Sequence, residues 1–271
     1  MSSNQEQIEY WNDRAGETWA ELQDRLDALL APLSAAALAA AEVRPGDHVL
    51  DVGCGCGDTS IAMSAMGAKV LGVDVSAPML ARARSRDASI EYQQADAATT
   101  DFAHAFDLVF SRFGVMFFDD PTAAFQNLRN ALKPGGRLLF VCWQPPTVNP
   151  WMATAGRAIA PYLPPSDEAP NPRAPGPFAF ADSGYVEQIL QNAGFSEIQI
   201  KAYEESLKVA DTLAEAVQFQ TRVGPAARVM AELEGDQRAR ALAAVEDALR
   251  PFDGASGLHL NSAVWLVSAE A

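Results

Sequence analysis

The apolar positions of the chain follow two different periods. Within residues 1–42, large apolar side chains recur at steps of three and four residues, which is the period of an α-helix. From residue 49 onward, short apolar runs alternate with helix-like segments. The runs that predict strands are residues 49–52, 69–74, 90–95, 107–111 and 137–143. This alternation predicts right-handed crossovers and a parallel sheet with helices on both faces.

Turn and capping residues predict where the helices begin and end. Pro32 is expected to open an alanine-rich helix within the N-terminal segment. Gly67 ends a helix that starts near Asp58. Ser76 and Asp120 are predicted N-caps, because each has a hydroxyl or carboxylate oxygen and is followed within two residues by a proline.

The second half of the chain departs from this alternation. Residues 145–181 are rich in proline and poor in strand signals, and so long a loop in a compact domain is usually functional. Helices are predicted at about 183–192 and over 211–252, the latter with Asp211 as its cap. The last predicted strands are 197–209 and 263–267, expected to pair as a hairpin. The predicted organisation is a helical cap at 1–42, a core at 43–145, a proline-rich lid loop at 146–181, and the rest of the core at 182–271 with a helical lid insertion at about 211–252.

A glycine-rich turn follows the first predicted strand, in the run Val-Leu-Asp-Val-Gly-Cys-Gly-Cys-Gly at 49–57. Asp74 ends the next strand, 21 positions after Gly53 (74 − 53), where a parallel neighbour can present a carboxylate to a ribose. The pattern therefore predicts a site for an adenosine-containing small molecule. A dinucleotide is disfavoured, because Asp58 and Ser60 stand where the fingerprint needs a small third residue. A tight turn without a ligand is the simpler alternative.

Composition limits the class of partner. The chain has 271 residues and a formal net charge of −15, which disfavours binding to nucleic acid or to an anionic membrane surface. No apolar stretch is long enough for a membrane helix, and no signal peptide precedes residue 10, so we expect a cytoplasmic protein. Cys54 and Cys56 lie in the glycine turn without a second Cys/His pair at ligand spacing, which disfavours a metal or redox pair.

Five segments resemble, in order and spacing, the motifs of class I S-adenosylmethionine-dependent methyltransferases. They are residues 51–57, 72–76, 94–97, 106–110 and 132–138. The resemblance covers residues 43–145 and is greatest to the small-molecule branch that includes the quinone C-methyltransferases. It implies a Rossmann-like α/β fold with a seven-stranded, mostly parallel sheet, a terminal antiparallel hairpin and helical lid insertions. It also implies S-adenosyl-L-methionine as cofactor, S-adenosyl-L-homocysteine as product, and no metal.

The resemblance assigns roles to residues around the turn. Asp74 is expected to accept the ribose hydroxyls, Asp96 the exocyclic amine of adenine, and Asp51 to orient the glycine turn. Val75 and Met79 are expected to pack on the adenine, although plain core packing is as consistent with these two. The predicted cofactor-binding residues are Trp11, Trp19, Asp51, Gly53, Cys54, Gly55, Gly57, Asp74, Val75, Met79, Asp96, Ala97, Ser111 and Arg112.

The acceptor is expected to be a small, largely apolar molecule, methylated by direct in-line displacement. The Asn/Asp-Pro-Pro-aromatic motif of DNA-base methyltransferases is absent after the fourth strand. The candidate acceptor residues are Met116, Trp143, Trp151, Phe178, Arg222 and His259. No general base is assigned, and the methylated atom and oligomeric state stay open. Another transferase that uses the same cofactor, or an inactive cofactor-binding protein, is the alternative.

Overall fold

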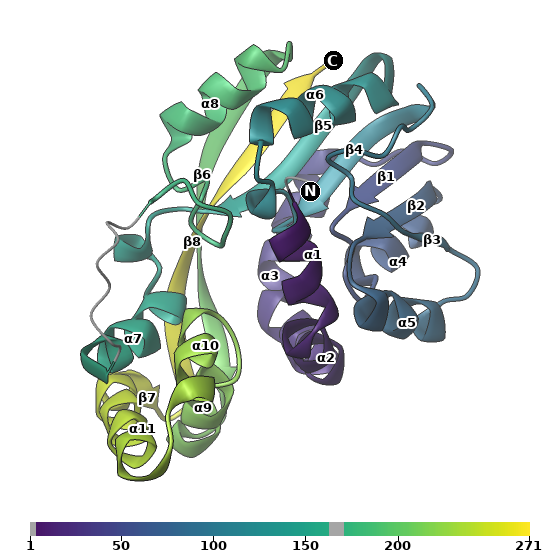
Figure 1. The fold of residues 1–271 in the computed structure, drawn as a ribbon. Helices are drawn as coiled ribbons and strands as arrows, with labels where there is room; N and C mark the ends of the chain where they lie inside the picture. The colour runs from purple at the N-terminus through teal and green to yellow at the C-terminus, as the bar shows by residue number, and fades with distance from the viewer. Residues whose placement is uncertain (1–3, 163–170) are drawn as a thin grey trace. The chain divides into compact units, whose positions relative to one another are not determined.

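The computed structural model describes residues 4–162 and 171–271. The predicted lid loop at 146–181 thus falls partly, at 163–170, outside the described residues. The chain divides into two compact units (Figure 1). The first unit comprises Met1–Gln144, Pro172–Tyr203 and Val264–Ala271, and the second comprises Pro145–Asn171 and Glu204–Ala263.

The central sheet has the strand order β3-β2-β1-β4-β5-β8-β6. Its strands are β1 His48–Val52, β2 Lys69–Asp74, β3 Glu91–Gln94, β4 Phe106–Arg112, β5 Leu132–Trp143, β6 Ser196–Ala210 and β8 Gly257–Glu270, with the two-residue β7 Asp253–Gly254 paired to β8. Strands β1 to β5 pair in parallel, and β8 is antiparallel to β5. The predicted α/β fold with a mostly parallel sheet is therefore confirmed. The strand order reverses between β1 and β4, and the carboxyl edge of such a sheet is where ligands bind.

Helices of the first unit flank this sheet. They are α1 Gln5–Asn12, α2 Arg14–Glu21, α3 Gln23–Ala41, α4 Asp58–Ala65, α5 Ala77–Arg86, α6 Pro121–Ala131 and α8 Ser183–Asn192, with the 3₁₀ turn η1 at Val115–Phe117. Helices α3 and α6 both contact β4 and β5, while α5 contacts β2 and β3. The predicted caps are confirmed, because Ser76 accepts a hydrogen bond from the Met79 N–H and Asp120 from the Ala123 N–H.

The second unit contains α7 Pro150–Ile159, α9 Leu213–Gln220, α10 Pro225–Glu232 and α11 Gly235–Leu249. The 3₁₀ turns η2 Pro146–Val148, η3 Ala160–Tyr162 and η4 Arg250–Phe252 also belong to it. Helix α11 packs against α7 and α9. Asn149 ties α7 to β8, since its side chain donates to the Ala263 carbonyl and accepts from the Ala263 N–H. The region 145–162 is thus not the structureless loop that its prolines suggested.

Two local predictions are wrong. Pro32 does not open a helix, because α3 runs through it from Gln23 to Ala41. Leu29, Leu30 and Leu33 are all buried, so packing on both sides outweighs the missing backbone donor. Asp211 is not the cap of α9: the Thr212 hydroxyl accepts the Glu215 N–H, and Asp211 instead pairs with Lys208.

Candidate functional site

The turn after β1 requires glycine on backbone grounds. Gly53, Gly55 and Gly57 have φ angles of 68°, 55° and 83°, in the left-handed region that other residues avoid. The N–H groups of Gly53 and Cys54 both donate to the Val73 carbonyl, at 2.8 and 3.1 Å. The turn is therefore fastened to the end of β2 and leads directly into α4.

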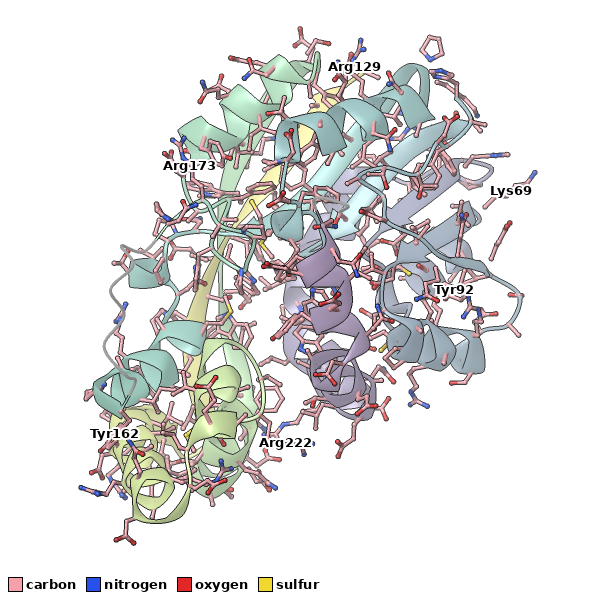
Figure 2. All side chains as sticks on the ribbon, in the orientation of Figure 1. Lys69, Tyr92, Arg129, Tyr162, Arg173 and Arg222 are labelled. Carbon is pink, nitrogen blue, oxygen red and sulfur yellow. The ribbon has the colours of Figure 1, made fainter. Side chains whose placement is uncertain are left out.

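Protein groups occupy the space beside each of these glycines. A Cβ atom on Gly53 would lie 2.6 Å from the Gly114 Cα, and one on Gly55 would lie 2.8 Å from the Met79 methyl. A Cβ on Gly57 would lie 2.5 Å from the hydroxyl of Tyr92, which is labelled in Figure 2. Close packing of β3, α5 and the loop after β4 against the turn is thus a second reason for glycine, besides the predicted approach of a cofactor.

Asp74 stands at the end of β2 with its carboxylate fixed by two backbone donors. One oxygen accepts the Gly55 N–H and the other accepts the Ser76 N–H, each at 2.8 Å. Burial raises the pKa of Asp74, and these hydrogen bonds partly oppose that effect. Each oxygen still has a further lone pair with which to accept a ligand hydroxyl.

Asp51 is fully buried in β1, and only one of its oxygens is satisfied. Oδ2 accepts the hydroxyls of Thr59 and Ser60, at 2.8 and 2.6 Å. Oδ1 is buried and has no hydrogen-bond partner among the described residues. Burial raises the pKa of Asp51 to about 6. The side chain therefore holds the start of α4 and retains one unused acceptor.

Asp96, after β3, shows the same asymmetry. Its Oδ1 accepts the Asn4 side-chain amide at 3.2 Å and the Ala98 N–H at 2.9 Å. Its Oδ2 is buried without a hydrogen-bond partner in the described part of the chain. Ala97 is buried, and its carbonyl accepts the Asn127 amide at 3.0 Å. The segment predicted to hold adenine thus also keeps an unused buried acceptor.

Arg112, at the end of β4, is engaged in a charged cluster. Its guanidinium lies 2.8 Å from Asp58 and 3.8 Å from Asp27. Arg86 also contacts Asp27, at 3.0 Å, and donates to the Cys56 carbonyl at 2.7 Å. Burial and the neighbouring Asp58 raise the pKa of Asp27. The cluster links α3, α4 and α5 to the glycine turn. Nothing in the sequence distinguished Asp27 and Arg86 from other polar helix positions.

Helix α1 is bonded to the carboxyl ends of β2 and β3. The Trp11 carbonyl accepts the Ser76 hydroxyl at 2.7 Å. The Trp11 ring meets Trp19 and Phe117 edge-on, with centroid distances of 5.7 and 5.2 Å. The Asn12 side-chain amide donates to the Val75 carbonyl at 2.8 Å. Trp11 therefore lies beside the end of β2 with Trp19 packed against it, and the roles of Trp11, Trp19 and Val75 in cofactor binding stay predictions.

The loop after β4 contains a strained aromatic residue that the sequence did not single out. Phe113 has a φ angle of 65°, which is unusual for a bulky residue. Its ring stacks on Trp143, with centroids 4.1 Å apart and planes 4° apart. The Ser111 hydroxyl accepts the Gly114 N–H at 3.2 Å, which closes the loop. Strain of this kind is retained where the surroundings fix it, often at functional sites.

The candidate acceptor residues divide between the two units. Met116, Trp143 and Phe178 belong to the first unit, where the Met116 carbonyl accepts the Gly176 N–H at 3.1 Å. Trp151, Arg222 and His259 belong to the second unit. Trp151 is buried on α7, Arg222 is half-buried after α9, and His259 is half-buried on β8. Their role stays a prediction.

The cysteines show no sign of reactivity or metal binding. Cys54, Cys56 and Cys142 are buried and free, and burial raises the pKa of the Cys56 thiol to about 12. Over residues 4–162 and 171–271, no group of three or more His, Cys, Asp or Glu side chains could hold a metal ion. Within the same ranges, no helix is long and apolar enough to cross a membrane.

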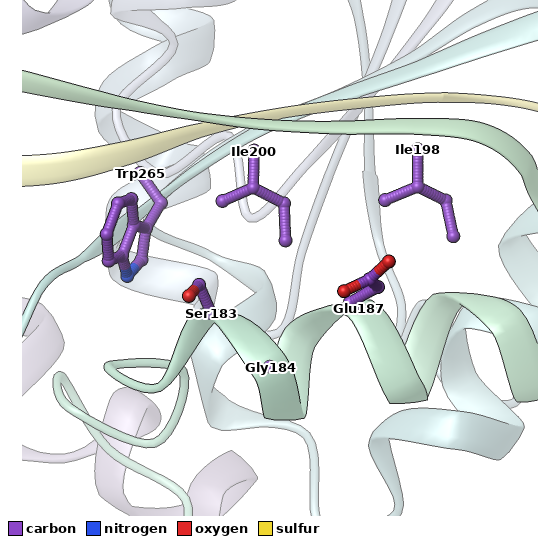
Figure 3. Close-up of a pocket in the computed structure, with 6 residues that line it drawn as sticks. All are labelled: Ser183, Gly184, Glu187, Ile198, Ile200 and Trp265. Atoms are coloured by element: carbon purple, nitrogen blue, oxygen red, sulfur yellow. The ribbon is translucent and has the colours of Figure 1, made fainter.

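A separate groove lies between α8 and the strands β6 and β8 (Figure 3). It is lined by Ser183, Gly184, Glu187, Ile198, Ile200 and Trp265. In the sheet order β6 is four strands from β1, which is roughly 19 Å at the usual strand spacing. The groove is therefore not part of the site at the glycine turn.

Comparison with known proteins finds a family similarity over the part of the chain that contains the glycine turn. Residues 50–140 match the family model described as a methyltransferase domain. An uncharacterised protein of Mycobacterium tuberculosis is 36% identical over 141 residues, which are 50% of this chain and 50% of that protein. Malonyl-[acyl-carrier protein] O-methyltransferase of Enterobacter lignolyticus is 40% identical over 141 residues, or 51% of this chain and 53% of that protein. The chain thus spans about half the length of these curated relatives.

Among solved structures, phosphoethanolamine N-methyltransferase 2 of Haemonchus contortus, in complex with S-adenosyl-L-methionine, has a TM-score of 0.53. It is 22% identical, and the likeness covers 88% of this chain and 52% of that one. At this identity the likeness shows the fold alone.

Proposed function

We propose that this chain, whose residues 50–140 match the model of a methyltransferase domain, is a class I S-adenosylmethionine-dependent methyltransferase that transfers a methyl group to a small, largely apolar acceptor. The observation that carries the proposal is a row of three carboxylates on adjacent strands. Asp51 lies in β1, Asp74 ends β2, and Asp96 follows β3. Two of the three keep a buried oxygen without a partner among the described residues.

The hydrogen-bond donors of S-adenosyl-L-methionine fit this row. The cofactor has an ammonium group at one end, two ribose hydroxyls in the middle and an adenine amine at the other end. Asp51 Oδ1 can accept the ammonium, Asp74 the hydroxyls, and Asp96 Oδ2 the amine. A buried acceptor without a donor costs about 1–3 kcal/mol, so a ligand that supplies the donor gains that energy on binding.

Other residues of the first unit complete the proposed cofactor site. The glycine turn brings backbone N–H and carbonyl groups to the amino-acid end. Val75 and Met79 pack on adenine, and Trp11 and Trp19 cover it from α1 and α2. The remaining members are Gly53, Cys54, Gly55, Gly57, Ala97, Ser111 and Arg112. Arg112 acts through Asp58, with which it is paired, and thereby holds the start of α4.

The bound cofactor supplies an activated methyl group, so the chain has to position the acceptor in line and exclude water. Met116, Phe113 and Trp143 supply apolar and aromatic walls near the ends of β4 and β5. For acceptor binding we propose Trp151, Arg222 and His259 of the second unit and, separately, Phe178 of the first unit. By their names, relatives of this domain act on unlike acceptors, malonyl-[acyl-carrier protein] and phosphoethanolamine, so the acceptor is proposed from the residues of this chain.

The test is methyl transfer itself. Wild-type protein is incubated with methyl-labelled S-adenosyl-L-methionine and a panel of phenols, quinols, thiols, amines and carboxylic acids, and labelled product is identified by mass spectrometry. Labelled product from at least one apolar acceptor is expected. Transfer of another part of the cofactor, or tight cofactor binding without turnover of any compound in the panel, would favour the alternative transferase or the inactive binding protein.

A further inference from the structure

Asn12, the last residue of α1, uses its whole side-chain amide in hydrogen bonds. Its Nδ2 donates to the carbonyls of Ile8 and Val75, at 2.7 and 2.8 Å. Its Oδ1 accepts the Ala77 N–H at 3.0 Å and the Gln94 amide at 3.4 Å. An asparagine amide has two donor hydrogens and two acceptor lone pairs, so all four are used.

These bonds converge on the segment that follows β2. Asn12 holds the residues on both sides of Ser76, and Ser76 in turn donates its N–H to Asp74. Gln94, at the end of β3, donates to the same Val75 carbonyl at 3.0 Å. The segment that presents the ribose acid and the adenine-packing residue is thus clamped by a single side chain from α1.

The surrounding backbone leaves little room for this clamp to shift. A Cβ on Gly16, in α2, would overlap the Trp11 carbonyl oxygen and would lie 2.6 Å from the Ser76 hydroxyl. The same Ser76 hydroxyl donates to the Trp11 carbonyl. Helices α1 and α2 therefore pack closely against the start of α5. Asn12 contributes a hydrogen bond to this contact by accepting the Ala77 N–H.

We propose that Asn12 is a positioning residue for the adenosine half of the cofactor, acting through Val75 and Asp74. This inference rests on the proposed function. The hydrogen bonds of Asn12 hold Val75 and the Asp74 carboxylate in place before the ligand arrives. Binding then loses less conformational entropy in ordering this segment. Without Asn12, the Ala77 N–H loses its acceptor, the Val75 carbonyl loses one donor, and the segment relaxes.

The experiment measures dissociation constants by calorimetry for two probes, S-adenosyl-L-homocysteine and 5′-methylthioadenosine, which lacks the amino-acid end. Asn12→Ala is expected to weaken the binding of both probes by the same factor of about tenfold. Asn12→Asp should be at least as weak, because an oxygen replaces the amide that donates to Ile8 and Val75. The matched control is Gln5→Ala on the same helix, which removes an exposed side chain that donates to Glu9 at 2.9 Å and should leave both dissociation constants within twofold.

Each outcome decides the inference. Measurements are made below the melting temperature of every variant, and if Asn12→Ala does not fold, Asn12→Asp carries the same comparison. A lowered melting temperature with unchanged dissociation constants would show that Asn12 stabilises the fold without affecting cofactor binding, and would overturn the proposal. Weakened binding of S-adenosyl-L-homocysteine but not of 5′-methylthioadenosine would place its effect at the amino-acid end and also overturn it. Wild-type protein that binds neither probe would refute the proposed function itself.

Discussion

Replacing Asp51 with asparagine should change stability and cofactor affinity in opposite directions. Asp51 is fully buried, and its Oδ1 has no hydrogen-bond partner among the described residues. Burial raises its pKa from 3.8 to about 6, so the folded protein binds the proton more tightly than the unfolded chain does. The free energy of unfolding therefore falls as the pH rises between about 4 and 6, and the loss is complete above that window.

The size of this loss in the free energy of unfolding follows from the shift in the Asp51 pKa. Two pKa units correspond to about 3 kcal/mol at 1.36 kcal/mol per unit. The asparagine side chain of the variant would keep an oxygen for the hydroxyls of Thr59 and Ser60 and would carry no charge. We expect Asp51→Asn to raise the free energy of unfolding at pH 8 by about 1–3 kcal/mol, and to have little effect near pH 4. Because it removes the proposed partner of the ammonium group, it should weaken cofactor binding by about 10- to 100-fold.

Urea unfolding followed by circular dichroism at pH 4.5 and pH 8 measures the first quantity, and calorimetry with S-adenosyl-L-homocysteine measures the second. In the wild type, affinity should also fall as the pH drops below about 6, where Asp51 takes up its proton. The conservative variant Ser60→Ala is the control, since it removes a hydroxyl donor from Oδ2 but retains the charge. A variant that is less stable at pH 8, or one that binds the ligand as tightly as the wild type, would refute this reasoning.

Three further outcomes are expected. Asp74→Ala should weaken S-adenosyl-L-homocysteine binding by about 10- to 100-fold and lower the melting temperature, because the N–H groups of Gly55 and Ser76 lose their acceptor; an unchanged calorimetric constant would place the ribose acid elsewhere. The double variant Cys54→Ser, Cys56→Ser should keep activity within about tenfold, and stoichiometric zinc in elemental analysis of either form would contradict it. Phe113→Leu should raise the acceptor KM by about tenfold with an unchanged cofactor dissociation constant, and the reverse pattern in steady-state kinetics would assign Phe113 to the cofactor.

The glycine turn and its acids could be predicted from the sequence because their constraints are local. The left-handed φ angles of Gly53, Gly55 and Gly57 exclude most other residues, and the length of a strand–helix–strand unit fixes where Asp74 stands. The same local logic correctly placed Ser76 as a cap. This reasoning missed a second constraint on Gly57, because the side chain of Tyr92 fills the space that a Cβ atom would need.

Contacts between residues far apart in the chain could not be predicted from the sequence, for a physical reason. Asn12 and Val75 are 63 positions apart, and an asparagine near the end of a helix gives no indication of its partners. Asp27 and Arg86 are polar residues on helices, where charged side chains are normally solvated. Pro32 misled because buried leucines on both sides keep α3 continuous, which is a tertiary effect.

A crystal structure of the protein with S-adenosyl-L-homocysteine tests the central claim most directly. The account predicts the amino group of the ligand within hydrogen-bonding distance of Asp51 Oδ1, both ribose hydroxyls on Asp74, and the adenine amine on Asp96 Oδ2. A ligand bound elsewhere, such as the groove beside α8, or bound at the glycine turn without contact to any of the three carboxylates, would contradict it.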